Sequence, residues 1–191
     1  NVDRVIFGWA MPASMTQFFN PFFIIVFGSI FSVMWVKLSK IGKNPSIPLK
    51  FCFGIVQLAL GFLITKVGFQ FVNESFQVPL LTLVFLYMLH TTGELFLSPI
   101  GLSMVTKLSP KSMAGTAMGA WFLSFAIANY VGGKIAAITG GHGGSDEALS
   151  VGEGLNQYLD IFSTIGYVLL GIALIIFLLN KPIKKLMHGV E

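Results

Sequence analysis

Hydrophobic residues fall into five long runs along the chain, separated by shorter polar segments. The runs cover about 14–36, 51–71, 78–105, 113–139 and 158–179. A helix needs roughly 20 mostly apolar residues to cross the hydrocarbon core of a bilayer, and each run is long enough. The pattern therefore predicts an all-α, polytopic membrane protein with five transmembrane helices.

The charges of the connecting segments alternate in sign. Lysines follow the first, third and fifth runs, at Lys37, Lys40, Lys43, Lys50, Lys107, Lys111, Lys181, Lys184 and Lys185. Acidic residues mark the second connector and the Gly-rich fourth, at Glu74, Asp146, Glu147 and Glu153. Because basic loops stay on the cytoplasmic side, we expect a periplasmic loop at 1–13 and a cytoplasmic C-terminus. The fourth connector, 139–156, is expected to be a flexible external loop.

Composition agrees with a membrane protein. Apolar types make up 54% of the chain and charged types 10%, against about 25% charged residues in soluble domains. The net charge of +4 does not indicate nucleic acid as a partner, because the basic residues lie between long apolar runs. The single cysteine, Cys52, provides neither a disulfide nor a metal site. The chain begins at Asn1 without a signal-peptide pattern, so we expect it to be the interior of a longer protein.

Glu94 is an acidic residue near the middle of the third run. Inserting such a residue costs about 2.5–3.5 kcal/mol, and charged residues within spans usually face a bundle interior or a water-filled cavity. Tyr87, His90, Thr91 and Ser98 share its helical face, three, four or seven residues away. The pattern predicts a buried glutamate that borders a substrate or ion path; a structural glutamate bonded to a neighbouring helix is the alternative.

Two prolines follow polar residues within the runs. Pro99, after Ser98, frees the carbonyl of Leu95 and predicts a kink, either in a cavity-lining helix or as an ordinary bend. Pro21 follows Asn20, whose amide can bond either a substrate or another helix.

Other residues of the spans permit both a functional and a structural interpretation. His90 can relay protons, because histidine titrates near neutral pH, or it can pack between helices. Trp121, Phe125 and Asn129 run along one side of the fourth span, as a pocket wall or as core.

The sequence contains no GxSxG, HExxH or Walker motif. We therefore expect no enzyme activity, no cofactor and no metal.

Three segments resemble one transporter family. The stretch GELFLSPIGLS at 93–103 is similar to the tenth-helix signature of the proton-dependent oligopeptide transporters (POT/PTR family) of the major facilitator superfamily. Gln17-x-x-Asn20-Pro21, followed by Trp35 and a Lys-rich loop, resembles their eighth helix, and GTAMGAWF at 115–122 their eleventh. The resemblance implies the C-terminal helix bundle of that fold, with helices eight to twelve present, and with helix seven and the entire N-terminal half absent from these residues.

The resemblance also implies roles for individual residues. Glu94 corresponds to the acid that pairs with the amino terminus of a peptide and takes part in proton coupling. Asn20 corresponds to a contact with the peptide backbone, and Ser98 to a hydroxyl that lines the pocket. Trp121 and Phe122 correspond to an aromatic wall of the side-chain pockets.

The function implied by the resemblance is proton-coupled symport of di- and tripeptides by alternating access, driven by the proton gradient without a cofactor. The expected location is the bacterial inner membrane, with the lipid bilayer and the N-terminal half of the same protein as partners. Two alternatives stay open: the same fold transporting another small solute, such as nitrate or a drug, and a non-transport membrane subunit.

Overall fold

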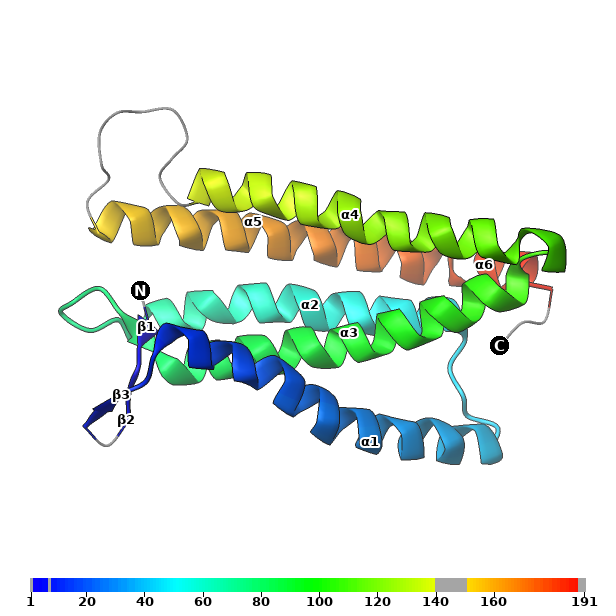
Figure 1. Cartoon of the computed structure of the whole chain (residues 1–191), viewed down its shortest axis with the longest axis horizontal. Coiled ribbons are helices and arrows are strands. Elements are labelled where there is room, and N and C mark those ends of the chain that lie inside the picture. Colours follow the sequence, from blue (N-terminus) through cyan, green and yellow to red (C-terminus); the bar gives the residue numbers. More distant parts are fainter. Residues whose placement is uncertain (1, 7, 140–150, 189–191) are drawn as a thin grey trace.

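Five long helices make up most of the computed structural model, which describes residues 2–6, 8–139 and 151–188. They are α1 (Phe19–Lys40), α2 (Ile47–Phe69), α3 (Leu80–Leu108), α4 (Ala114–Thr139) and α5 (Val151–Leu178). A short helix, α6 (Asn180–Leu186), follows, and 3-10 turns η1 (Ala13–Phe18) and η2 (Lys111–Met113) precede α1 and α4. The long helices run alternately up and down one axis (Figure 1). The predicted all-α class is confirmed.

The described residues include four very short strands, and β1 to β3 lie at the end of the bundle where α3 begins (Figure 1). β1 (Val2–Asp3) pairs in parallel with β4 (Val78–Pro79). β2 (Val5–Ile6) pairs antiparallel with β3 (Trp9–Ala10), and Gly8 turns between them at a φ of 82°, which glycine adopts without steric cost. The segment 1–13, which was expected to be a periplasmic loop, therefore pairs through β1 with the strand that precedes α3.

The helix ends differ from the predicted ones in ways that the local chemistry explains. Pro21 lies in the first turn of α1, which continues directly from the 3-10 turn η1, and a helix tolerates proline there because the backbone N–H groups of a first turn have no α-helical acceptor. α5 begins at Val151, not at 158. Its first turns are amphipathic: Leu155 is buried while Glu153 and Asp160 are exposed. A search for continuous apolar runs misses such an extension.

α2 is the central helix, and a glycine faces α3 at every seventh position. A Cβ on Gly54 would lie 2.9 Å from the carbonyl oxygen of Gly93. Gly61 receives the ring of His90 in the same way, and Gly68 receives Thr82. Small residues let the backbones of membrane helices approach closely. On its other side α2 meets α5, where the thiol of Cys52 donates to the carbonyl of Ala173 at 3.3 Å.

In the described part of the chain, four helical segments are long and apolar enough to cross a membrane: Ala13–Lys40, Ile47–Phe69, Leu80–Leu108 and Gly152–Leu178. α4 is less apolar because it carries glycines, Ser124, Asn129 and Lys134. Its 26 residues are nevertheless long enough for a core of about 30 Å, at a rise of roughly 1.5 Å per residue. The crossing of α4 stays a prediction.

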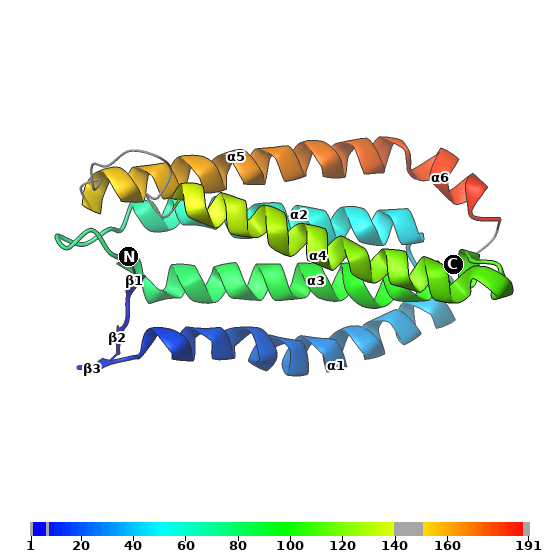
Figure 2. The same ribbon diagram turned by 45° about the horizontal axis from the view of Figure 1, so that its top comes forward.

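The three lysine-bearing segments, which follow α1, α3 and α5, gather at one end of the bundle (Figures 1 and 2). Most of the Gly-rich connector between α4 and α5, including Asp146 and Glu147, lies outside the described residues.

Candidate functional site

The site expected around Glu94 is built on the middle of α3. Glu94 itself is exposed, so the prediction that it is buried is wrong for this chain. Its neighbours on the predicted polar stripe are covered: Thr91 is 0% exposed, and Tyr87, His90 and Ser98 are partly buried. Helical spacing placed these residues within one broad sector, but only part of that sector is left open. Glu94 lies on the open part, where no described helix covers it.

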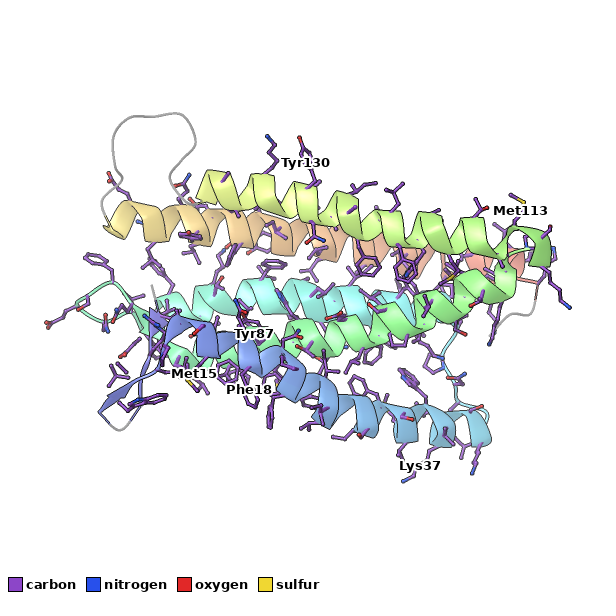
Figure 3. All side chains as sticks on the ribbon, in the orientation of Figure 1. Met15, Phe18, Lys37, Tyr87, Met113 and Tyr130 are labelled. Atoms are coloured by element: carbon purple, nitrogen blue, oxygen red, sulfur yellow. The ribbon has the colours of Figure 1, made fainter. Side chains whose placement is uncertain are left out.

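Asn20 approaches α3 from the first turn of α1. Its Nδ2 donates to Oγ1 of Thr91 at 3.2 Å, one turn before Glu94. Beside this bond the rings of Phe19 and Tyr87 meet with centroids 6.1 Å apart, and Figure 3 shows Tyr87 where α3 runs beside α1. The structure therefore brings the predicted amide and the predicted acid to the same region of the α1–α3 pair.

His90 turns toward α2, not toward the open face. Its imidazole lies over Gly61, its ring centroid is 4.5 Å from that of Phe62, and it hydrogen-bonds to the backbone of Leu58. Its Nε2 is buried without a hydrogen-bond partner. This placement fits the packing interpretation of His90, while its role in proton coupling stays a prediction.

Ser98 and Gly101 continue the Glu94 side of α3 toward its end, and unlike Glu94 both are at least partly covered. α3 continues as a helix through Pro99 to Leu108. Two residues beyond the proline, Gly101 contacts Trp121 of α4. The indole ring occupies the space that a side chain on residue 101 would need. Trp121 also meets Phe125 edge to face at 6.3 Å. Because Gly101 follows Glu94 by seven residues, the predicted aromatic wall and the predicted acid lie on the same side of α3.

Phe122 does not join Trp121 against α3. It is 58% exposed on α4 and meets Phe125 at 6.2 Å. Further along the same helix Tyr130, 67% exposed, points away from the bundle (Figure 3). The role of Phe122 in the wall of a side-chain pocket therefore stays a prediction. It requires that α4 faces a cavity to which other parts of the protein contribute.

Phe96, which the sequence analysis did not single out, is the centre of an aromatic cluster on the side of α3 opposite Glu94. Its ring meets Phe31 at 5.0 Å and Trp35 at 5.2 Å, both from α1, and Phe53 of α2 at 6.4 Å, all edge to face. The ammonium of Lys50, which is 7% exposed, lies 4.7 Å from the centroid of the Trp35 ring. The spacing of Phe27, Phe31 and Trp35 by four residues was the available signal.

A cavity of about 360 Å³ lies elsewhere, between α2, α3 and α5 near β1 and β4. Its lining is mostly apolar, including Phe69, Leu83 and Leu155, and it contains no residue predicted for the site. Among the described residues no group of three or more His, Cys, Asp or Glu side chains is placed to hold a metal ion. The predicted groups on this side of α3 are the carboxylate of Glu94, the amide of Asn20, the hydroxyl of Ser98 and the indole of Trp121.

The model of the POT family matches residues 1–147. Dipeptide and tripeptide permease A of Edwardsiella piscicida is 34% identical over 189 residues, and dipeptide and tripeptide permease B of Xenorhabdus bovienii (strain SS-2004) is 33% identical over 188. The alignments cover 99% and 98% of this chain, respectively, and 38% of each permease.

The fold agrees as well. The crystal structure of peptide transporter POT in complex with sulfate has a TM-score of 0.82 and 31% identity, over 99% of this chain and 35% of that one. The chain thus spans little more than a third of the length of these relatives. The predicted resemblance to the POT family and the major facilitator fold are confirmed, as is a multi-pass membrane protein. Because the family model covers well over half of its residues, the chain belongs to the POT family of transporters.

Proposed function

We propose that the protein is a proton-coupled symporter of di- and tripeptides and that this chain supplies one wall of its central site. The observation that carries the proposal is the position of Glu94 on the open face of α3. The Asn20–Thr91 bond lies on one side of it and the Trp121–Gly101 contact on the other. A carboxylate, an amide and an aromatic ring are the groups that recognise an ammonium, a peptide bond and a side chain.

The energetics favour an ammonium as the partner of Glu94. An uncovered carboxylate keeps access to water while the site is empty, and it loses that water when a ligand and other helices close over it. The charged form then needs an opposite charge nearby, which the amino terminus of a peptide provides. A proton can neutralise the same carboxylate in place of the ammonium. Competition between proton and ammonium is a simple means of coupling their movements.

The driving force and the orientation follow from general membrane physics. Moving one elementary charge down the membrane potential yields about 2.3 kcal/mol per 100 mV. With the lysine-bearing end in the cytoplasm, the C-terminus is cytoplasmic and β1–β4 lie on the periplasmic side of a bacterial inner membrane. The opposite wall of the site comes from the N-terminal half of the transporter, and alternating access arises as the two halves rock around the site.

The test is uptake of radiolabelled dialanine by proteoliposomes that contain the complete protein. An inward proton gradient should accelerate uptake, and a protonophore should abolish the acceleration. Glu94→Gln should reduce gradient-driven uptake by at least tenfold at an unchanged amount of protein in the membrane. Glu74→Gln, a control on the exposed segment between α2 and β4, should leave it unchanged.

The same assay separates peptides from other solutes. Unlabelled di- and tripeptides should compete with dialanine, whereas nitrate should not. Competition by nitrate without competition by peptides would overturn the choice of substrate, and full activity of Glu94→Gln would overturn the role of that residue.

A further inference from the structure

Thr91 is the most completely covered polar side chain near the open face of α3. It is 0% exposed, and its Oγ1 accepts the hydrogen bond from Nδ2 of Asn20, which belongs to another helix 71 positions earlier in the chain. A buried hydroxyl that reaches across two helices has a different task from one that bonds within its own turn.

The direction of this bond decides what Asn20 can offer to a ligand. A side-chain amide has a donor end, Nδ2, and an acceptor end, Oδ1. Because Nδ2 is held by Thr91, Oδ1 is the end that remains for a substrate N–H. We propose that Thr91 is a positioning residue that holds the Asn20 amide in this orientation. The inference rests on the proposed function, in which Asn20 contacts the peptide backbone.

The neighbouring aromatic contact between α1 and α3 cannot replace this bond. The rings of Phe19 and Tyr87 are 6.1 Å apart at an interplanar angle of 48°. Such a contact keeps the two helices together, but it leaves the rotation of the neighbouring amide free. Without the Thr91 hydroxyl the amide loses this partner and can rotate, so that its Oδ1 is no longer held toward a substrate N–H.

The adjacent residue provides a matched control. Thr92 is also buried, at 7% exposure, but its hydroxyl donates to the carbonyl oxygens of Met88 and Leu89 in its own helix, at 2.8 and 3.2 Å. Thr91→Val and Thr92→Val make the same change of shape and polarity in the same turn, and only the first removes a partner of Asn20.

The experiment measures the concentration dependence of dialanine uptake by the complete protein in proteoliposomes, with protein amounts normalised. Thr91→Val should raise KM about fivefold with little change in the maximal rate, which is the effect expected for one lost hydrogen bond. Thr91→Ser keeps the hydroxyl and should restore the KM of the wild type, and Thr92→Val should also resemble the wild type. In an Asn20→Ala background, Thr91→Val should have no further effect on KM.

The results distinguish this inference from the proposed function. If the wild type takes up dialanine normally but Thr91→Val and Thr92→Val have equal KM values, the positioning role is wrong and the function stands. A further rise of KM when Thr91→Val is added to Asn20→Ala also overturns it, because the hydroxyl would then act without the amide. If the wild type takes up no dialanine, the function fails and this inference fails with it.

Discussion

The indole ring of Trp121 lies against the backbone of Gly101, so closely that a methyl group on Gly101 would overlap the ring. The missing side chain on α3 thus fixes where an aromatic residue of α4 can stand. Since Gly101 follows Glu94 by two helical turns on the same side, this contact sets the distance between the proposed ammonium site and the proposed side-chain pocket.

Gly101→Ala should therefore change the selectivity of the transporter for bulky peptides. Overpacking a close contact costs about 1–3 kcal/mol, and displacement of the Trp121 ring relieves it. We expect the KM of an aromatic dipeptide to change at least threefold more than that of dialanine, as measured by competition for uptake. Gly115→Ala on α4, where a Cβ would meet nothing within 4 Å, is the control. Equal changes for both peptides would contradict the role of Trp121.

The open face of α3 can be mapped with thiol reagents. These 191 residues hold a single cysteine, Cys52, which is buried; the background for labelling is Cys52→Ala in a complete protein from which any further cysteines have been removed. In this background Glu94→Cys should react with a water-soluble methanethiosulfonate at least tenfold faster than Thr91→Cys or His90→Cys, because only residue 94 is uncovered. Comparable rates at all three positions would mean that the face is not divided as described.

The sequence predicted the long helices and selected Glu94 and Asn20, because length, hydropathy and an isolated charge are local properties. It could not predict that Glu94 is uncovered while Thr91, three residues earlier, is fully buried. Which part of a helical face is covered depends on the neighbouring helix. His90 turns to α2 because Gly61 leaves space for its ring, and that space is a property of a residue on another helix.

The cluster around Phe96 shows the same limit. Phe31, Trp35 and Phe53 come from two helices, and their convergence depends on the crossing of α1, α2 and α3. Aromatic residues spaced by four indicate a helical face, but they do not identify the ring that this face meets.

The close approach of α2 and α3 predicts a large effect of a small substitution. A Cβ on Gly93 would lie 2.8 Å from the carbonyl oxygen of Gly54, a backbone atom that cannot rotate away. Gly93→Ala should lower the stability of the folded protein by about 1–3 kcal/mol, seen as a lower Tm in detergent. Gly133→Ala, on α4 in open space, should not. An unchanged Tm of Gly93→Ala would show that the helices separate at little cost.

Lys50 should stabilise the lysine-bearing end of the bundle through Trp35. A buried cation over an aromatic ring contributes about 0.5–2 kcal/mol, so Lys50→Met should lower the Tm by a measurable amount. Lys50→Arg should retain most of the stability, because a guanidinium also stacks on indole. The exposed Lys43 is the control. The interpretation would fail if Lys50→Met and Lys43→Met had the same Tm.

The glycines of α2 also limit how the bundle can move. One turn of sliding along the helix axis, in either direction, would bring Leu89 or Leu97 to the place where Gly93 meets the carbonyl of Gly54. Neither leucine fits there, so α2 and α3 keep their axial register and move as one rigid pair. Any movement of α3 along its axis that displaces Glu94 would then carry α2 with it.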